Sequence, residues 1–456
     1  MGRPSSSEVT GHRRCRGRVV LLRGPCGAAR WGAAGAASRC RYGLLRARSS
    51  DVVVVVAESL PTVCKRCQQT ISNEGVTGCR PSGDPWGVLP WGRRRRPEPP
   101  RAKEPEVRAA FLPGGSRVEL REVPDPAPGH GQVLLATRAS TICGSDLRAI
   151  YREHLGEGPE AYQGVVGGHE PAGRVIAVGT GVERTAVGDR VVVYHISGCG
   201  QCDECRRGYQ ISCTGAGRAA YGWQRDGGHA DLLLAEERDL LVLPDELTFL
   251  DGAVVACGFG TAYEALCRVG VSGRDRVLVT GLGPVGCAIG LLAKAMGSPL
   301  VVGTDPSPAR RALALQLGAV DHTVSGTDEE LDALLDGPGG GAEVAVDASG
   351  NGRGQLTALR HTRRWGRAAL VGEGGQLSVD VSEVLIHRQL TVHGSWVTST
   401  GRMSELLANL ARWDLHPQVL VSDTFPIAEA AEAYRVADAA TGGKVGITWP
   451  DDEAGA

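Results

Sequence analysis

Residues 276–296 read RVLVTGLGPVGCAIGLLAKAM, and this stretch decides the fold of the 456-residue chain. Residues 276–280 have the composition of a short buried strand. A glycine-rich turn follows at residues 281–286, and an apolar run with the character of a helix then continues to Met296. Because the glycines lie between a strand and a helix, the stretch has the context that a dinucleotide-binding fingerprint requires.

Each glycine of this turn has a separate predicted role. Gly281 permits a tight turn, Gly283 lets the backbone approach a pyrophosphate, and Gly286 allows close packing of the helix. The helix N-terminus offers free N–H groups and the positive end of its dipole to the phosphates. The predicted cofactor-binding residues of the turn are Gly281, Gly283, Pro284, Val285 and Gly286.

The pattern then alternates between strands and helices. A second strand at residues 300–304 ends at Asp305, whose carboxylate can accept hydrogen bonds from a ribose 2′-hydroxyl and would repel a 2′-phosphate. This position favours NAD over NADP. Ser307 can cap the next helix, and further strands are predicted at residues 343–347 and 367–371 with a helical stretch between them. Such a succession is typical of a parallel, doubly wound sheet.

Four of the fourteen cysteines follow the spacing Cys199-x2-Cys202-x2-Cys205-x7-Cys213. Four thiols at these intervals can surround one tetrahedral zinc ion, and a fully ligated ion has no open position for a substrate. The pattern therefore predicts a structural zinc site. A redox pair and an iron–sulfur cluster are the alternatives.

A second group of potential ligands is dispersed along the chain. It consists of Cys143 in the segment TICGSD, the pair His169 and Glu170 in GHE, and Cys257 in ACGF. Taken singly, each residue has a structural interpretation, because a lone cysteine is usually a small buried apolar residue and a lone histidine is usually hydrogen-bonded structure.

The segment GHE-x2-G-x5-G-x2-V, residues 168–182, resembles the signature of the zinc-containing alcohol dehydrogenases in the medium-chain dehydrogenase/reductase superfamily. The Cys-Gly-Ser-Asp segment, the four-cysteine segment and the Cys-Gly-Phe-x-Thr segment stand in the order of that family. The likeness extends over about residues 107–450, and we identify the chain as a member.

The resemblance implies an α/β fold with a Rossmann doubly wound parallel sheet and a β-rich, GroES-like catalytic domain. Residues 107–257 would form the catalytic domain, with the structural zinc lobe at 199–213. Residues 258–395 would form the NAD-binding domain, and residues 396–456 would return to the catalytic domain. The active site would lie in the cleft between the two domains, where a closing motion can exclude water.

The resemblance also assigns the second group of ligands. Cys143, His169 and Cys257 would bind the catalytic zinc, and Glu170 would lie beside the metal or bind it transiently. Two thiolates and a neutral imidazole balance the +2 charge of zinc. An alcohol oxygen in the fourth position would be polarised and would lose its proton more readily than in water.

By the same likeness, Ser145 would accept the substrate proton and begin a relay to solvent, although it could be a local cap or turn hydroxyl. Asp146 would orient the metal-binding loop. Arg148 stands where relatives often have the histidine that ends the relay, and arginine is always charged, so it cannot shuttle protons. Tyr151, His154 or water could take that place.

Three further cofactor contacts follow from the resemblance. Arg310 would lie against the adenosine ribose, although it could instead assist a 2′-phosphate. Thr261 and the turn at residues 371–373, which contains Gly372, would contact the nicotinamide end.

The implied activity is the reversible oxidation of a secondary alcohol or polyol to a ketone, with hydride transfer to NAD and two zinc ions per subunit. The segment around Cys143 resembles the polyol and threonine dehydrogenase branches, which often have glutamate where this chain has Cys257. The substrate stays open among polyols, cyclitols, amino alcohols and simple secondary alcohols. The alternatives are an aldehyde or ketone reductase of the same family and a non-catalytic nucleotide-binding relative.

Composition limits the partners. The formal net charge of −1 argues against a general nucleic-acid binder, and no stretch approaches the roughly 20 apolar residues that span a membrane. We expect a small-molecule alcohol or ketone as the substrate and a homodimer or homotetramer. Since zinc-binding thiols are best kept reduced, we expect a cytoplasmic protein.

Residues 1–106 differ from the rest of the chain. The first fifty residues are rich in Arg, Ala, Gly and Ser, and Glu8 is their only acidic residue, which resembles a mitochondrial transit peptide. The alternative is a misplaced start codon, because the recognisable domain begins at Val107 and a GTG start codon would be translated internally as valine. We expect a disordered or non-native extension, and a chain beginning at Val107 should retain its zinc and its activity.

Overall fold

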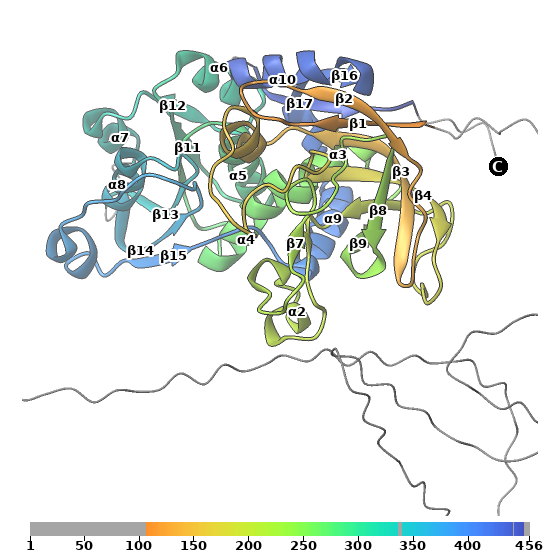
Figure 1. The fold of residues 1–456 in the computed structure, drawn as a ribbon. Helices are drawn as coiled ribbons and strands as arrows, with labels where there is room; N and C mark the ends of the chain where they lie inside the picture. The colour runs from red at the N-terminus through yellow and green to blue at the C-terminus, as the bar shows by residue number, and fades with distance from the viewer. Residues whose placement is uncertain (1–105, 336–339, 441, 451–456) are drawn as a thin grey trace, which may run out of the picture. The chain divides into compact units, whose positions relative to one another are not determined.

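The computed structural model describes residues 106–335, 340–440 and 442–450 (Figure 1). The chain divides into two units, Met1–Arg95 and Arg96–Ala456, and every described residue belongs to the second. The extension expected at residues 1–106 lies outside the described residues, except for Glu106, with which the first strand begins. Its disorder or non-native origin stays a prediction.

Six strands form one fully parallel sheet in the order β12-β11-β10-β13-β14-β15. The order turns back beside β10, because the chain first extends the sheet on one side and then on the other. In such doubly wound sheets, ligands bind at the carboxyl ends of the strands where the order reverses. The predicted Rossmann sheet is confirmed. The strands are β10 (Val277–Thr280), β11 (Val301–Thr304), β12 (His322–Val324), β13 (Ala342–Asp347), β14 (Thr362–Leu370) and β15 (Thr391–Gly394).

Helices connect these strands (Figure 1). The Ser307 side chain caps α6 by accepting a hydrogen bond from the Arg310 backbone, as the sequence predicts. Strand β14 begins five residues earlier than expected, and Arg363 in this added part has the Glu343 carboxylate as a partner that accommodates its charge. The helices are α5 (Pro284–Ala295), α6 (Pro308–Gln316), α7 (Asp328–Leu335) and α8 (Gly352–Arg360), and the π-helix η5 (Val381–Ile386) precedes β15.

A second sheet of seven strands has the order β16-β17-β3-β4-β5-β9, with β8 also paired to β3. Its central strand β3 is largely buried along its ten residues, as expected of a strand with neighbours on both edges. The strands are β3 (Gln132–Thr141), β4 (Glu170–Val178), β5 (Arg190–Val193), β8 (Leu232–Glu236), β9 (Leu240–Val242), β16 (Val421–Pro426) and β17 (Lys444–Thr448).

The last strands of the chain lie in the sheet of the first. β17 pairs antiparallel with β3, so that Gly446 lies opposite Thr141, and β16 extends the sheet beyond β17. Two helices accompany this return, α9 (Thr400–Trp413) and α10 (Ala430–Ala439). A short 3-10 turn, η7 (Ile427–Glu429), directly precedes the second of them.

Shorter elements complete the second sheet's surroundings. A hairpin of β1 (Glu106–Phe111) and β2 (Glu119–Pro124) packs near β3. A small ribbon of β6 (Ile196–Ser197) and β7 (Ala219–Ala220) leads into the cysteine-rich segment. This segment contains α2 (Asp203–Arg206) and the 3-10 turn η2 (Gln210–Ser212). Other short helices are α1 (Gly144–Asp146), η1 (Leu147–Tyr151), α3 (Phe249–Val254), the π-helix η4 (Val255–Phe259) and α4 (Gly260–Val269).

One apolar core joins the two sheets. It runs from Val192 in β5 through Phe259 and Leu266 to Val279 in β10 and Leu292 in α5, and all five side chains are buried. The helices η4 and α4 therefore fix the position of one sheet relative to the other. None of the helices in these described ranges combines the length and the apolar composition that crossing a membrane requires.

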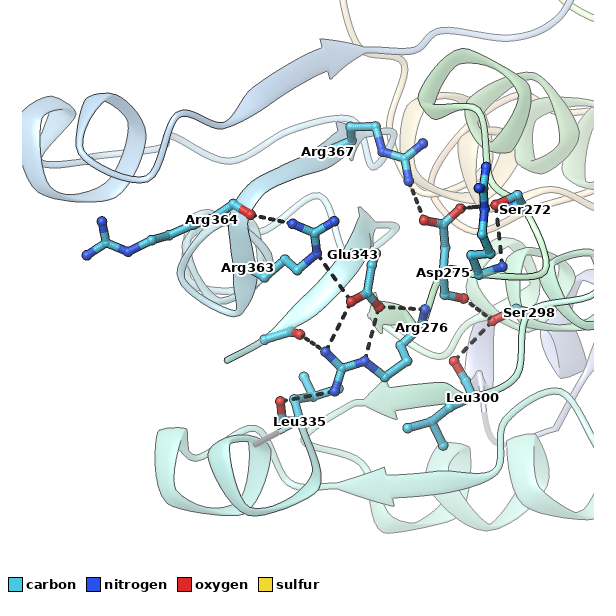
Figure 2. A network of polar contacts seen from close by, with 12 residues as sticks. Ser272, Asp275, Arg276, Ser298, Leu300, Leu335, Glu343, Arg363, Arg364 and Arg367 are labelled. Carbon is cyan, nitrogen blue, oxygen red and sulfur yellow. Dashed lines mark hydrogen bonds and ion pairs between the residues drawn. The ribbon is translucent and has the colours of Figure 1, made fainter. Parts of the chain in front are cut away.

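The amino ends of β10, β13 and β14 are joined by ion pairs (Figure 2). The Arg276 guanidinium and backbone N–H both donate to Glu343, at 3.0 and 2.8 Å. Arg363 approaches the other carboxylate oxygen at 3.2 Å, and Asp275 pairs with Arg367. The polar network lies at the end of the sheet opposite the glycine turn, so it stabilises the sheet away from the predicted cofactor site.

Candidate functional site

Four side chains from three separate segments meet at one point. Each offers one potential metal-ligand atom, and these atoms all lie within 4.8 Å of one another; they belong to Cys143, His169, Glu170 and Cys257. The structure thus brings together all the residues that the sequence predicts around the catalytic zinc. Their metal binding itself stays a prediction.

The pairing of β3 with β4 explains this meeting. Thr141, the last residue of β3, lies opposite Glu170, the first residue of β4. Cys143 follows β3 directly and His169 precedes β4, so both lie at the same end of the sheet. Cys257 comes from the π-helix η4, and short π segments are frequent at functional sites.

Asp146 holds two of these residues in place. Its carboxylate is fully buried; one oxygen lies 2.7 Å from His169 Nδ1 and the other accepts a hydrogen bond from the Cys143 backbone at 3.0 Å. Nδ1 therefore donates to Asp146, which leaves Nε2 as the nitrogen that a metal would bind after displacing any proton there. Burial opposes a charged imidazole, but Asp146 outweighs this and raises the pKa of His169 well above its usual value.

The two thiols of the group influence each other. The Cys257 thiol faces Cys143, and this contact lowers the pKa of Cys143 well below its usual range while raising the pKa of Cys257. The protein alone therefore favours one thiolate. A bound cation would displace the proton of the second thiol, since metal binding releases protons from its ligands.

Glu170 has one carboxylate oxygen that is buried without a hydrogen-bond partner. Its side chain is fully buried, and burial raises its pKa to about 7 against the opposing effect of Lys444. The Oε2 atom lies 2.6 Å from Lys444 Nζ and accepts a hydrogen bond from the Thr141 hydroxyl. The Oε1 atom is buried and has no hydrogen-bond partner, although such orphan atoms are rare in native proteins.

This set of residues fits a zinc ion. Two thiols, an imidazole whose Nδ1 is held by Asp146 and a carboxylate oxygen without a partner are the donor types that zinc prefers. Three strong donors with the carboxylate beside them would leave one coordination position for a substrate.

Ser145 and Arg148 lie on the loop after Cys143. The Ser145 hydroxyl is 3.5 Å from His169 Nε2, beside the predicted metal position. Arg148 donates to the Gly144 carbonyl at 3.3 Å and approaches the Glu373 carbonyl at 3.5 Å. Arg148 thus bridges the metal-binding loop and the turn at residues 371–373, a role that the sequence analysis missed.

The two residues considered as substitutes for the relay histidine have other partners. His154 Nε2 lies 2.8 Å from the Leu112 carbonyl, and its ring packs against Tyr162. Tyr151 is buried with its ring 5.1 Å from that of Tyr434. Among the described residues, the structure records no hydrogen bond from either of them to Ser145.

The four cysteines of the lobe also form a compact group, with ligand atoms within 4.8 Å of one another. The sulfur atoms of Cys199 and Cys205 are 4.0 Å apart, and those of Cys202 and Cys213 are 3.9 Å apart. A tetrahedral zinc with Zn–S bonds of about 2.3 Å places its sulfurs about 3.8 Å apart. The geometry therefore fits a fully ligated ion.

Backbone N–H groups favour a thiolate at Cys202 of this lobe, whereas burial raises the pKa of Cys205. N–H groups of Cys205 and Thr214 lower the pKa of Cys202 to about 6, and Cys213 Sγ accepts from two further N–H groups. At Gly198 any side chain would lie 2.6 Å from the Cys205 sulfur, so this position requires glycine.

The glycine turn has the form that a dinucleotide requires. Gly281 has φ +89°, and a Cβ at Gly286 would lie 1.8 Å from the Gly281 carbonyl oxygen, so both positions need glycine. A Cβ at Gly283 would meet nothing within 4 Å, which leaves an open space at the N-terminus of α5, where Pro284 and Val285 begin the helix. A pyrophosphate would fit there.

Asp305 has a structural role beside its predicted one. It is 3% exposed, and its two oxygens accept hydrogen bonds from the backbone of Leu282 at 2.9 Å and of Ser307 at 2.8 Å. Arg310 lies 3.7 Å from the same carboxylate. Asp305 therefore braces the glycine turn, and each of its oxygens keeps a lone pair for a ribose hydroxyl.

The predicted nicotinamide contacts lie on two elements. Thr261 is half-buried near the start of α4. Gly372 follows β14, and a Cβ there would lie 2.1 Å from the Gly350 backbone. Residues 371–373 line a cavity of about 360 Å³ whose lining also includes Tyr209 and Arg268.

Two buried residues near the metal ligands were missed by the sequence analysis. His195 has its ring centre 5.3 Å from that of His169 and its Nδ1 2.8 Å from the Ala256 carbonyl, and burial lowers its pKa to about 4. Lys444 is the other, and burial of its ammonium is compensated by Glu170. Signals existed in both cases, namely a histidine ending a valine-rich strand and a rare lysine in an apolar C-terminal segment.

Comparisons with known proteins agree with this description. The family model of the alcohol dehydrogenase GroES-like domain matches residues 129–245, and that of the zinc-binding dehydrogenases matches residues 284–412. The chain is 49% identical over 348 residues to the uncharacterized zinc-type alcohol dehydrogenase-like protein YphC of Escherichia coli K12, covering 75% of this chain and 99% of that protein.

Two further relatives are named for an activity. L-threonine 3-dehydrogenase of Pyrococcus abyssi is 33% identical over 279 residues, covering 60% of this chain and 78% of the relative. The crystal structure of L-idonate 5-dehydrogenase from Escherichia coli K-12 superposes with a TM-score of 0.66 at 25% identity, covering 75% of this chain and 98% of that one. The chain belongs to the zinc-containing alcohol dehydrogenases of the medium-chain dehydrogenase/reductase superfamily.

Proposed function

We propose that the protein is a zinc-dependent dehydrogenase that transfers hydride between NAD and a secondary alcohol, polyol or amino alcohol. The observation that carries the proposal is the group of Cys143, His169, Glu170 and Cys257, with the buried Glu170 Oε1 lacking a partner. The relatives named above support a substrate whose reacting hydroxyl has polar groups nearby, since threonine and idonate both have a hydroxyl of this kind.

The metal ligands, Asp146 and Ser145 would each have a separate role in this reaction. Cys143, His169 and Cys257 would hold zinc, which supplies Lewis-acid polarisation of the substrate oxygen. Asp146 fixes the imidazole and the Cys143 backbone in ligating positions. Ser145, 3.5 Å from His169 Nε2, is placed to accept the proton of the substrate hydroxyl.

The cofactor side has the charges that suit NAD. The carboxylate of Asp305 at the end of β11 would repel a 2′-phosphate. Arg310 lies 3.7 Å from Asp305, so its charge is already balanced by that carboxylate and is less available to a phosphate. We infer NAD as the preferred cofactor, with Gly281, Gly283 and Gly286 forming the pyrophosphate turn and Thr261 and Gly372 near the nicotinamide.

The setting of the enzyme is part of the proposal. Six thiols that would bind two zinc ions need a reducing compartment, so we propose that the protein works in the cytoplasm. We further propose a homodimer or homotetramer, which light scattering of the purified chain would establish.

The test is a substrate panel on the purified full chain. Polyols, cyclitols, threonine and simple secondary alcohols are each supplied with NAD, and NADH absorbance is followed while metal analysis counts zinc. We expect two zinc ions per chain and NADH formation with at least one class. His169→Ala should lose both the activity and one zinc, whereas His322→Ala, at an exposed position on β12, should keep both.

Two results would contradict the proposal. If the His169→Ala variant is as active as the unmodified chain, the proposed catalytic metal site is wrong. Full zinc and NAD binding without turnover of any substrate in either direction would favour the non-catalytic nucleotide-binding alternative, whereas turnover only of ketones or aldehydes would favour a reductase.

A further inference from the structure

Lys444 stands apart from the other lysine in the described part of the chain. Its residue exposure is 4%, whereas the Lys294 side chain is about one-third exposed and pairs with Asp321 at the surface. Lysine is almost never fully buried unless it is paired. Lys444 Nζ lies 2.6 Å from Glu170 Oε2 and 3.3 Å from the Ile142 carbonyl, which precedes the predicted ligand Cys143.

The Glu170 carboxylate is held from two directions. Lys444 approaches Oε2 from β17, and the Thr141 hydroxyl donates to the same oxygen from β3. Oε1 has no protein partner. One oxygen is thus committed to the protein, and the other is the atom that a metal in this group would attract.

The charges explain why a cation is needed there. Two thiolates, the Glu170 and Asp146 carboxylates and a zinc ion sum to −2 in a buried site, and the Lys444 ammonium reduces this sum to −1. Without Lys444, zinc would be the nearest cation for a buried Glu170, and an unpaired buried charge is costly. The carboxylate would then bind the metal and occupy the position that a substrate needs.

We propose that Lys444 is a positioning residue that retains Glu170 and so keeps the fourth coordination position of the catalytic metal available to substrate. This rests on the proposed metal site of Cys143, His169 and Cys257. Lys444 touches neither substrate nor cofactor in this role, and it acts through Glu170.

The test uses cobalt in place of zinc and imidazole as the probe of the open position. The full chain is loaded with Co²⁺, and imidazole is titrated while the visible absorption of the cobalt is recorded. Imidazole is neutral, so the loss of a lysine charge does not by itself change its attraction to the site. The four-cysteine site is an internal control, because full ligation gives it no response to imidazole.

We expect Lys444→Met to weaken imidazole binding by about 10-fold or more, the usual scale for residues that orient metal ligands. The double variant Lys444→Met with Glu170→Gln should restore affinity to within about threefold of the unmodified chain, since the amide has no charge to be drawn to the metal. Lys444→Arg, which keeps the charge, should stay close to the unmodified chain. Imidazole affinity separates this role from a merely structural one, because a lysine that only balances a buried charge would change the stability of the fold and leave imidazole binding unchanged.

The possible failures are distinguishable. If Lys444→Met binds cobalt and imidazole as the unmodified chain does, the role of Lys444 is overturned and the proposed function stands. The same conclusion follows if the double variant is as impaired as Lys444→Met. If the unmodified chain takes up no imidazole-responsive cobalt, the metal site and the proposed function fall together with the inference.

Discussion

Asp146→Asn is the substitution that tests the metal site most directly. Aspartate at this position accepts on both oxygens, from His169 Nδ1 at 2.7 Å and from the Cys143 backbone at 3.0 Å. Asparagine has nearly the same shape but only one accepting atom. One of the two contacts must therefore be lost, or the imidazole must move its proton to Nε2, where it would block metal binding.

The size of the effect follows from the kind of contact that is lost. A hydrogen bond to a charged, buried group contributes about 1.5–3 kcal/mol, and Asp146 is fully buried. Converted at about 1.4 kcal/mol per tenfold change, the affinity of the site for zinc should fall about 10- to 150-fold.

The assay is a competition for zinc between the protein and a chelator of known affinity. Asp438→Asn is the matched control, because it removes a carboxylate of the same kind from the surface of α10, where it pairs with Arg152. The control should bind zinc as the unmodified chain does. Zinc affinity of Asp146→Asn within threefold of the unmodified chain would show that Asp146 does not orient the ligands.

Three further outcomes are expected. Ser145→Ala should lower kcat/KM by about 100-fold or more with zinc content unchanged, whereas Ser145→Thr keeps the hydroxyl; equal rates for the alanine variant would exclude Ser145 from the proton path. Asp305→Ser should lower the ratio of kcat/KM for NAD over NADP by about tenfold, because a like charge near the 2′-phosphate is removed, and an unchanged ratio would mean that Asp305 only braces the glycine turn. Glu343→Gln should lower the free energy of unfolding, measured in urea, by about 2 kcal/mol at neutral pH. Burial opposes the charge of Glu343, but Arg276 lowers the pKa of this carboxyl, so its stabilising effect is present at neutral pH and is lost as the pH falls through that lowered pKa. In acid, the variant and the unmodified chain should therefore unfold with the same free energy. Equal urea midpoints at neutral pH would show that the network in Figure 2 contributes nothing.

The fold was predictable because its signals are local. The strand, glycine turn and helix at residues 276–296 follow one another along the chain, and Ser307 caps α6 through its own neighbours. The four cysteines of the lobe lie within fifteen residues, so their spacing alone constrains the geometry. Physical proximity here follows directly from sequence proximity.

The missed parts of the site depend on the register of distant strands. Whether Lys444 or a neighbouring residue lies beside Glu170 is set by the pairing of Gly446 with Thr141, and a shift of one residue would turn the lysine to the other face of the sheet. The contact of Arg148 with the Glu373 carbonyl likewise joins two segments that no local pattern connects. The second role of Asp305 was hidden because its backbone partners are supplied by the folded turn.

The metal site and the C-terminal strand are mutually dependent. Thr141, Glu170 and Lys444 come from three adjacent strands, and pairing places their hydroxyl, carboxylate and ammonium in contact in the interior. Neither buried charge is stable alone, because desolvation of an unpaired ion costs several kcal/mol. The carboxylate beside the predicted ligands therefore keeps its position only once β17 has closed the sheet. Three predicted ligands in the first part of the chain are thus insufficient to define the site, since the electrostatic balance around them is completed by Lys444 near the other end of the described residues.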